Sequence, residues 1–338
     1  MQDQNIKSQQ TAFALIRILF GVVWLLNAWF QASSAYQGQL LANFSANESG
    51  QSFWVHDYMH WILQGMQSIA DPSATIIMVI LDVFIGVSLV LGVWGRFFGW
   101  VGLVYSAFLW TSFEGFGGPY GSGATDPGPG IIYAIVFGFL LATSAWDKLS
   151  LSPIASSSAT SGAAPGSGLV APWKQPLAFD LDRMTAVRII FGLVWTFDAF
   201  WKWHPYFLNH LVTVITQGDH SDPGWLLVYV NFVIAIIRGI GPEVVAVVIA
   251  LLETSIAVSL LTGQWLRLFV PVGLVFSMGI WFTAEGLGGP YTATSTGMPD
   301  DIVGNAIIYV FAFAILYVAN YRFHAKTQTI QGRPVATV

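Results

Sequence analysis

The sequence predicts an all-α integral membrane protein built from two copies of one four-helix unit. Only 9% of its residues are charged, 55% are hydrophobic and the mean hydropathy is +0.63, whereas a soluble domain has about 25% charged residues. The chain also repeats at an offset of 171 residues, because the segment EGFGGPY from Glu114 to Tyr120 matches EGLGGPY from Glu285 to Tyr291. We therefore expect two similar halves in a lipid bilayer.

The same offset holds over a long stretch of the chain. It pairs Arg17 with Arg188, Trp24 with Trp195, Asp82 with Glu253, and Arg96 with Arg267. We assign residues 1–148 to the first repeat and residues 179–338 to the second. Residues 149–178 between them are rich in Ser, Ala, Gly and Pro, a composition typical of a flexible linker.

Eight segments are close to the roughly 20 apolar residues that cross the hydrocarbon layer. The expected spans are 12–32, 74–94, 97–116 and 130–147 in the first half, and 185–203, 244–264, 268–287 and 303–320 in the second. Each half also holds an ambiguous segment, 52–70 and 223–240. The polarity of the first favours an amphipathic helix in the membrane interface, whereas the second is more apolar and is compatible with a span.

The distribution of basic residues favours four spans per half. With the N-terminus inside, this arrangement places 11 of the 13 Lys and Arg residues on the cytoplasmic side, and only Lys202 and Arg238 outside. Five spans per half give a split of 7 to 6, and cytoplasmic loops favour Lys and Arg. We expect two parallel four-helix bundles in the inner membrane, with both termini and the linker cytoplasmic and the glycine loops on the outer face.

Composition also excludes several classes of function. The chain has no polybasic run, so we expect no nucleic-acid partner. It has no Cys, which excludes iron–sulfur ligation and covalent haem attachment in this chain. Its six His residues lie near segment ends or in loops, so we expect no transmembrane haem either. If electrons pass through the protein, the expected carrier is a quinone or a cofactor of a partner.

Two acids lie within the apolar second span of their half. Asp82 and Glu253 occupy equivalent positions, about 12 Å below the outer end at 1.5 Å per residue. One interpretation is structural, with hydrogen bonds to neighbouring helices. The other is a carboxyl that handles protons or binds a ligand, which is the usual role of an ionisable group inside a membrane.

The glycine loops have two possible roles. The glycines permit positive φ and convergent N–H groups, an arrangement that can bind an anion or a quinone oxygen; in the second half they are Gly286, Gly288 and Gly289. Tyr120 and Tyr291 would then offer hydroxyl groups to the ligand. Alternatively, each loop is a tight turn in which Glu114 or Glu285 caps the backbone that follows.

The second half has additional charged residues at the end of its first span. Asp198 and Lys202 are four residues apart and share a helix face, whereas the first half has Asn27 and Gln31 at these positions. Lys202 either belongs to a site or extends to the interface and pairs with Asp198 for stability.

We predict catalytic or binding residues mainly in the second half. The predicted catalytic residues are Glu253, Glu285, Asp198 and Lys202, and the predicted substrate or quinone ligands are Tyr291, Gly286, Gly288, Gly289, Asp82, Glu114 and Tyr120.

Other polar residues have simpler interpretations. His56 and His60 are four residues apart, a spacing that can hold a metal, but without further matching ligands they indicate a polar helix face, so no metal site is predicted. Arg17, Arg188, Arg96 and Arg267 lie at inner helix ends, where anchoring to lipid headgroups explains them.

Each half resembles the DoxX/DoxD family of four-span membrane proteins. The likeness rests on Phe-Gly after Arg17 and after Arg188, on Lys202, on the buried acids followed by GVWGR (92–96) and GQWLR (263–267), and on the EGxGGPY loops. The loops look most like the DoxD subunit associated with thiosulfate:quinone oxidoreductase. This resemblance implies thiosulfate oxidation at the outer face, electron transfer to membrane quinone, and a second membrane or periplasmic redox subunit.

Two other functions fit the same pattern. One is a non-catalytic accessory or assembly subunit of a respiratory or oxidase complex. The other is a small-solute transporter, because parallel repeats with intramembrane acids also suit transport. Transport is disfavoured because the acids lie in the outer half and no span is broken near its middle by paired Gly and Pro.

Overall fold

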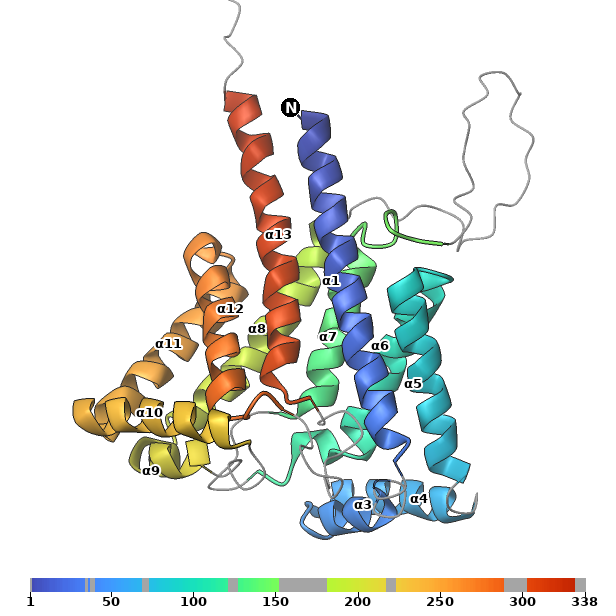
Figure 1. The fold of residues 1–338 in the computed structure, drawn as a ribbon, viewed down its shortest axis with the longest axis vertical. Helices are drawn as coiled ribbons and strands as arrows, with labels where there is room; N and C mark the ends of the chain where they lie inside the picture. Colours follow the sequence, from blue (N-terminus) through green and yellow to red (C-terminus); the bar gives the residue numbers. More distant parts are fainter. Residues whose placement is uncertain are drawn as a thin grey trace, which may run out of the picture.

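A computed structural model of the chain describes residues 2–33, 36, 40–68, 73–120, 127–151, 181–216, 223–288 and 303–331. Their secondary structure is helical throughout (Figure 1). The first half contains α1 (Gln2–Gln31), α3 (Leu40–Ser49), α4 (Phe53–Ser68), α5 (Ser73–Leu91), α6 (Gly95–Ser112), the 3-10 turn η1 (Gly115–Gly117) and α7 (Pro129–Ala142). The second half contains α8 (Leu181–Lys202), α9 (Pro205–Thr216), α10 (Gly224–Ile240), α11 (Pro242–Thr262), α12 (Leu266–Thr283) and α13 (Ala306–Gln331).

Five helices in the described part of the chain are long and apolar enough to cross a membrane. They are Ile6–Gln31, Ser73–Leu91, Arg183–Lys202, Pro242–Thr262 and Leu266–Thr283. Shorter apolar helices occupy Pro129–Ala142, Gly224–Ile240 and Ala306–Ala319. Large apolar side chains remain exposed along these helices, for example Leu19, Phe84 and Leu251, which is the surface that lipid requires. These features are those of an integral membrane protein.

Four helices lie across the ends of the long ones. In Figure 1, α3 and α4 of the first half and α9 and α10 of the second lie at the same end of the molecule. Both segments that were ambiguous in the sequence, 52–70 and 223–240, belong to this crosswise layer. On α4, Val55, Met59 and Leu63 are buried while Trp61 is exposed, as expected for a helix that packs on the protein and exposes an aromatic ring at an interface.

Corresponding helices make corresponding contacts in the two halves. In the first half, α1 contacts α5, α5 contacts α6, and α6 contacts α7. In the second half, α8 contacts α11, α11 contacts α12, and α12 contacts α13. The two halves meet where α7 contacts α13. The first helix of each half also contacts the last helix of the other half, since α1 contacts α13 and α8 contacts α7. The Phe20 ring lies 5.4 Å from the Phe311 ring across this seam, and Phe139 lies 6.0 Å from Phe191. One hydrophobic core therefore spans both halves.

Glycine allows the third and fourth helices of each half to pack closely. A Cβ atom at Gly102 on α6 would overlap the ring of Phe137 on α7, and one at Gly273 on α12 would overlap the ring of Phe313 on α13. Small residues let neighbouring membrane helices approach in this way. The two positions are equivalent in the repeat, so both halves use the same contact.

Two of the arginines donate to backbone carbonyl groups, Arg17 to groups that follow α7 and Arg188 to one in the last turn of α11. The Arg17 side chain is fully buried and donates to the carbonyl oxygens of Ala145 at 2.9 Å and Leu149 at 2.6 Å. Arg188 donates to the carbonyl oxygen of Leu260 in the last turn of α11. The last carbonyl groups of a helix lack partners within the helix. Anchoring to lipid headgroups was therefore the wrong interpretation of Arg17.

We expect Gly273→Ala to lower the melting temperature in detergent, with a loss of about 1–3 kcal/mol in unfolding free energy from overpacking. Gly279 on the same helix is a matched control, because a Cβ atom there would meet no atom of the structure within 4 Å. Gly279→Ala should leave stability unchanged or raise it by up to about 1 kcal/mol through helix propensity. Equal melting temperatures for the two variants, measured by thermal unfolding, would contradict the close α12–α13 packing.

Candidate functional site

The paired glutamates cap the last helix of each half. Both carboxylate oxygens of Glu285 accept from the backbone N–H of Ala306, at 3.0 and 2.9 Å, where α13 begins. Glu114 Oε1 accepts from the N–H of Gly130 at 2.9 Å, in the first turn of α7. A carboxylate at a helix N-terminus satisfies an otherwise unpaired donor and interacts favourably with the helix dipole. Of the two roles considered for the loop, these contacts support capping.

The glycine loops turn back onto the segment that precedes the last helix. Gly117 and Gly288 have φ of +84° and +65°, and a Cβ atom at either would overlap the carbonyl oxygen of Pro127 or Val303. The loops are fixed by equivalent tryptophans, since Trp110 donates to the Pro127 carbonyl at 2.8 Å and Trp281 to the Val303 carbonyl at 2.9 Å. Gly286 has φ of +54° within the same turn. Gly289 and Tyr291 lie outside the described residues.

Lys202 is buried in the second half beside an acid of another helix. Its Nζ atom lies 3.6 Å from Glu253 Oε2 and 5.4 Å from the centre of the Phe207 ring. Lys202 is 9% exposed and Glu253 is 2% exposed. The lysine side chain is therefore mostly covered by protein, and its environment includes α11 as well as its own helix. A buried pair of this kind costs desolvation free energy, which close pairing has to offset.

Asp198, one turn before Lys202, accepts a hydrogen bond from the hydroxyl of Tyr309 at 2.6 Å. Tyr309 lies on α13, one turn after the N–H that Glu285 caps, so the cap helps to place this hydroxyl. Tyr309 was not among the residues predicted from the sequence. The available signal was Tyr133, which matches Tyr309 once a five-residue insertion in the second loop shifts the offset from 171 to 176.

The first half repeats this arrangement with fewer charges. Asn27 Nδ2 donates to the Tyr133 hydroxyl at 2.9 Å, in place of the Asp198–Tyr309 bond. Gln31 is buried where the second half has Lys202. Asp82, like Glu253, is 2% exposed, so both acids lie within the protein, as expected, and away from lipid. The concentration of charge in the second half is what distinguishes the two copies.

Equivalent polar atoms in both halves lack hydrogen-bond partners within the described part of the chain. The indole N–H groups of Trp24 and Trp195, and the hydroxyls of Ser106 and Ser277, are buried without a hydrogen-bond partner among the described residues. Buried donors of this kind are normally satisfied by protein or by ordered water. These donors recur at matching positions of the two halves.

Tyr120 connects the first loop to the second half. Its ring centre lies 4.8 Å from that of Phe197 and 6.1 Å from that of Trp201, both on α8. The sequence predicts Tyr120 as one of the substrate or quinone ligands. The structure places its ring against the helix that supplies Asp198 and Lys202.

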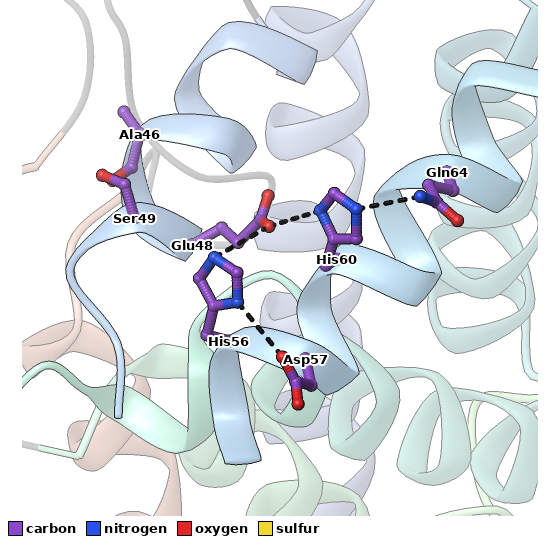
Figure 2. A network of polar contacts seen from close by, with 7 residues as sticks. All are labelled: Ala46, Glu48, Ser49, His56, Asp57, His60 and Gln64. Atoms are coloured by element: carbon purple, nitrogen blue, oxygen red, sulfur yellow. Dashed lines mark hydrogen bonds and ion pairs between the residues drawn. The ribbon is translucent and has the colours of Figure 1, made fainter. Parts of the chain in front are cut away.

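His56 and His60 form a separate cluster at the crosswise layer (Figure 2). His60 Nδ1 lies 2.7 Å from Oε1 of Glu48 on α3, and His56 Nε2 lies 3.4 Å from the same oxygen. Asp57 approaches His56, and Gln64 approaches His60. Within the described residues no group of three or more His, Asp or Glu side chains is arranged to hold a metal ion. The cluster instead joins α3 to α4 through direct hydrogen bonds.

Comparisons with protein-family models, curated proteins and solved structures gave no match to this chain. The candidate site is therefore defined by its residues alone: a buried Lys202–Glu253 pair, the adjoining Asp198–Tyr309 hydrogen bond, and a loop of the first half that reaches the same helix.

We expect Glu285→Ala to lower the unfolding free energy by about 1–2 kcal/mol, because the variant removes the cap of α13. Glu285→Gln keeps one acceptor oxygen and should retain more than half of that stability, and Glu114→Ala should resemble Glu285→Ala. Thermal unfolding in detergent measures the three variants. An unchanged melting temperature in Glu285→Ala would show that the cap is not structural.

Proposed function

We propose that this chain is the membrane subunit of a quinone-linked redox system and that its second half binds the quinone headgroup beside Lys202 and Glu253. The single observation behind this proposal is a cation buried with a carboxylate inside an apolar helical core, in one of two otherwise similar halves. Ionisable groups inside a membrane are costly and commonly mark a ligand or proton pathway. The first half, with Gln31 in the lysine position, lacks this cation.

The residues fit a quinone headgroup. A quinone oxygen is a hydrogen-bond acceptor, and the Lys202 ammonium, the Trp195 indole and the Ser277 hydroxyl are buried donors in this half. When bound, a quinone accepts two electrons and two protons. Glu253 and the Asp198–Tyr309 pair are the groups of this chain that would deliver protons, while the apolar side chains around them exclude bulk water.

Thiosulfate is the proposed electron source, on the strength of the resemblance of the glycine loops to the DoxD branch. Two thiosulfate ions lose one electron each and join through a new S–S bond as tetrathionate. The two electrons, together with two protons taken up from water, convert one quinone to the quinol. We place the oxidation on a partner subunit at the outer face, since this chain contains no Cys for thiol or iron–sulfur chemistry.

The capping role of both loop glutamates favours one alternative, an accessory subunit without a redox ligand. In that case the loops and buried polar pairs would serve stability and docking, and no quinone would bind to the purified chain.

We further propose that the chain crosses the bilayer eight times, as two parallel four-helix bundles. This proposal is supported by Figure 1, in which the start of α1 and the end of α13 lie at one end of the molecule and the crosswise helices lie at the other. The expected location of 11 of the 13 Lys and Arg residues on one side is consistent with this topology.

The topology predicts that Thr160→Cys in the linker reacts with a membrane-impermeant maleimide only after the cells are opened. Ser122→Cys in the first outer loop should react in intact cells. The native chain has no Cys, so background labelling is absent. Labelling of position 160 from outside would refute the proposed orientation.

We expect Lys202→Gln, which copies Gln31 of the first half, to weaken binding of a short-chain quinone by about tenfold or more, because a charged hydrogen-bond donor is lost. Gln31→Met and Asp82→Asn should change the dissociation constant less than about twofold. Titration of the purified chain in nanodiscs measures these values.

Removing one member of a buried pair can also unfold the protein. The double variant Lys202→Gln/Glu253→Gln restores neutrality and should recover stability without recovering binding. Undiminished quinone binding in the folded double variant would refute the assignment to the second half. Absence of binding in the unmodified chain would favour the accessory subunit.

A further inference from the structure

We infer that the loop of the first half completes the site in the second half, with Tyr120, Phe197 and Trp201 forming an aromatic wall that holds the ring of the bound quinone. This inference rests on the proposed function and specifies where the ring lies. Its basis is the contact of Tyr120 with α8 across the seam between the halves.

Helix geometry places the aromatic wall beside the charged residues. Phe197 and Trp201 are one turn apart on α8, and Asp198 and Lys202 follow each by one residue. Residues four apart share a face, and successive residues are rotated by about 100°. The aromatic and charged pairs therefore form adjacent ridges at the same end of α8. A headgroup that accepts a hydrogen bond from Lys202 is within reach of the aromatic ridge.

The loop that supplies Tyr120 is held in place by other aromatic residues. The Tyr120 hydroxyl donates to the carbonyl oxygen of Phe116. The Phe116 ring in turn lies 5.3 Å from Trp54, 6.1 Å from Tyr58 and 5.4 Å from Trp110. Tyr120 is thus fixed before any ligand arrives, which reduces the entropy cost of binding.

Trp201 provides the second observation that indicates a ligand. Its indole N–H is buried and has no hydrogen-bond partner among the described residues. A buried indole N–H usually finds an acceptor, and the ring beside it favours a planar ligand in an offset-stacked arrangement. A planar ring that bears carbonyl oxygens satisfies both requirements, whereas a small inorganic anion uses only the N–H.

The two copies differ at these positions. Phe197 and Trp201 correspond to Leu26 and Phe30 of α1, so the first half has one ring and no indole N–H there. This difference follows the difference in charge, since both the aromatic ridge and the Lys202–Glu253 pair belong to the second half. It also provides a matched control position.

The test measures binding of a short-chain quinone to the full chain in nanodiscs by titration calorimetry. We expect Tyr120→Ala to weaken binding about three- to tenfold through loss of ring contact. Tyr120→Phe retains the ring but loses the hydrogen bond to the Phe116 carbonyl, and it should weaken binding less than Tyr120→Ala does. Trp201→Phe should weaken binding about fivefold through loss of the N–H donor, and Phe30→Leu should change it less than twofold. Thermal unfolding confirms that each variant is folded.

The outcomes separate this inference from the proposed function. If Lys202→Gln abolishes binding while folded Tyr120→Ala and Trp201→Phe bind normally, the site stands and the aromatic wall is refuted. If the unmodified chain binds no quinone, the proposed function itself fails. A photoreactive azidoquinone gives an independent readout: labelling of the segment 197–202 supports the wall, and labelling confined to other helices overturns it.

Discussion

Each polar group buried among these helices needs a partner inside the protein, because the surrounding hydrocarbon offers none. This constraint explains several long-range polar contacts among the described residues. Glu114 and Glu285 satisfy the first N–H groups of the last helix in each half. Arg17 satisfies carbonyl groups that follow α7. These contacts join segments far apart in the chain, so they fix how the helices are placed as well as satisfying donors and acceptors.

The same constraint makes the divergence of the two halves informative. An asparagine–tyrosine hydrogen bond in the first half becomes an aspartate–tyrosine bond in the second. A buried glutamine is matched by Lys202, which lies beside Glu253. Both versions occur in halves whose corresponding helices make equivalent contacts. Stability alone therefore does not require the charged version. This is the main physical reason to look for a ligand in the second half.

The seam between the halves links structure to the proposed site. α7 and α13 meet there, and the helices that follow the glutamate caps are the same two helices. The loop before α7 also reaches across to α8 through Tyr120. A duplicated chain whose halves share one core can build one site from both copies, which a pair of independent bundles cannot do.

The sequence alone determined the membrane class, the two-fold repetition, the burial of Asp82 and Glu253, and the stronger charge of the second half. These properties depend on composition and on residue type at matching positions. Only the tertiary structure decided the partners. Local spacing paired Lys202 with Asp198, whereas helix packing added Glu253 on α11 and connected Asp198 to Tyr309 on α13. It also assigned the loop glutamates to helix caps and brought Tyr120 to the other half. Such contacts depend on the rotation of each helix about its axis and on the path of each loop. Both are set by packing between segments far apart in the chain; Asp198 and Tyr309, for example, are 111 residues apart. A local sequence pattern contains no information about such packing.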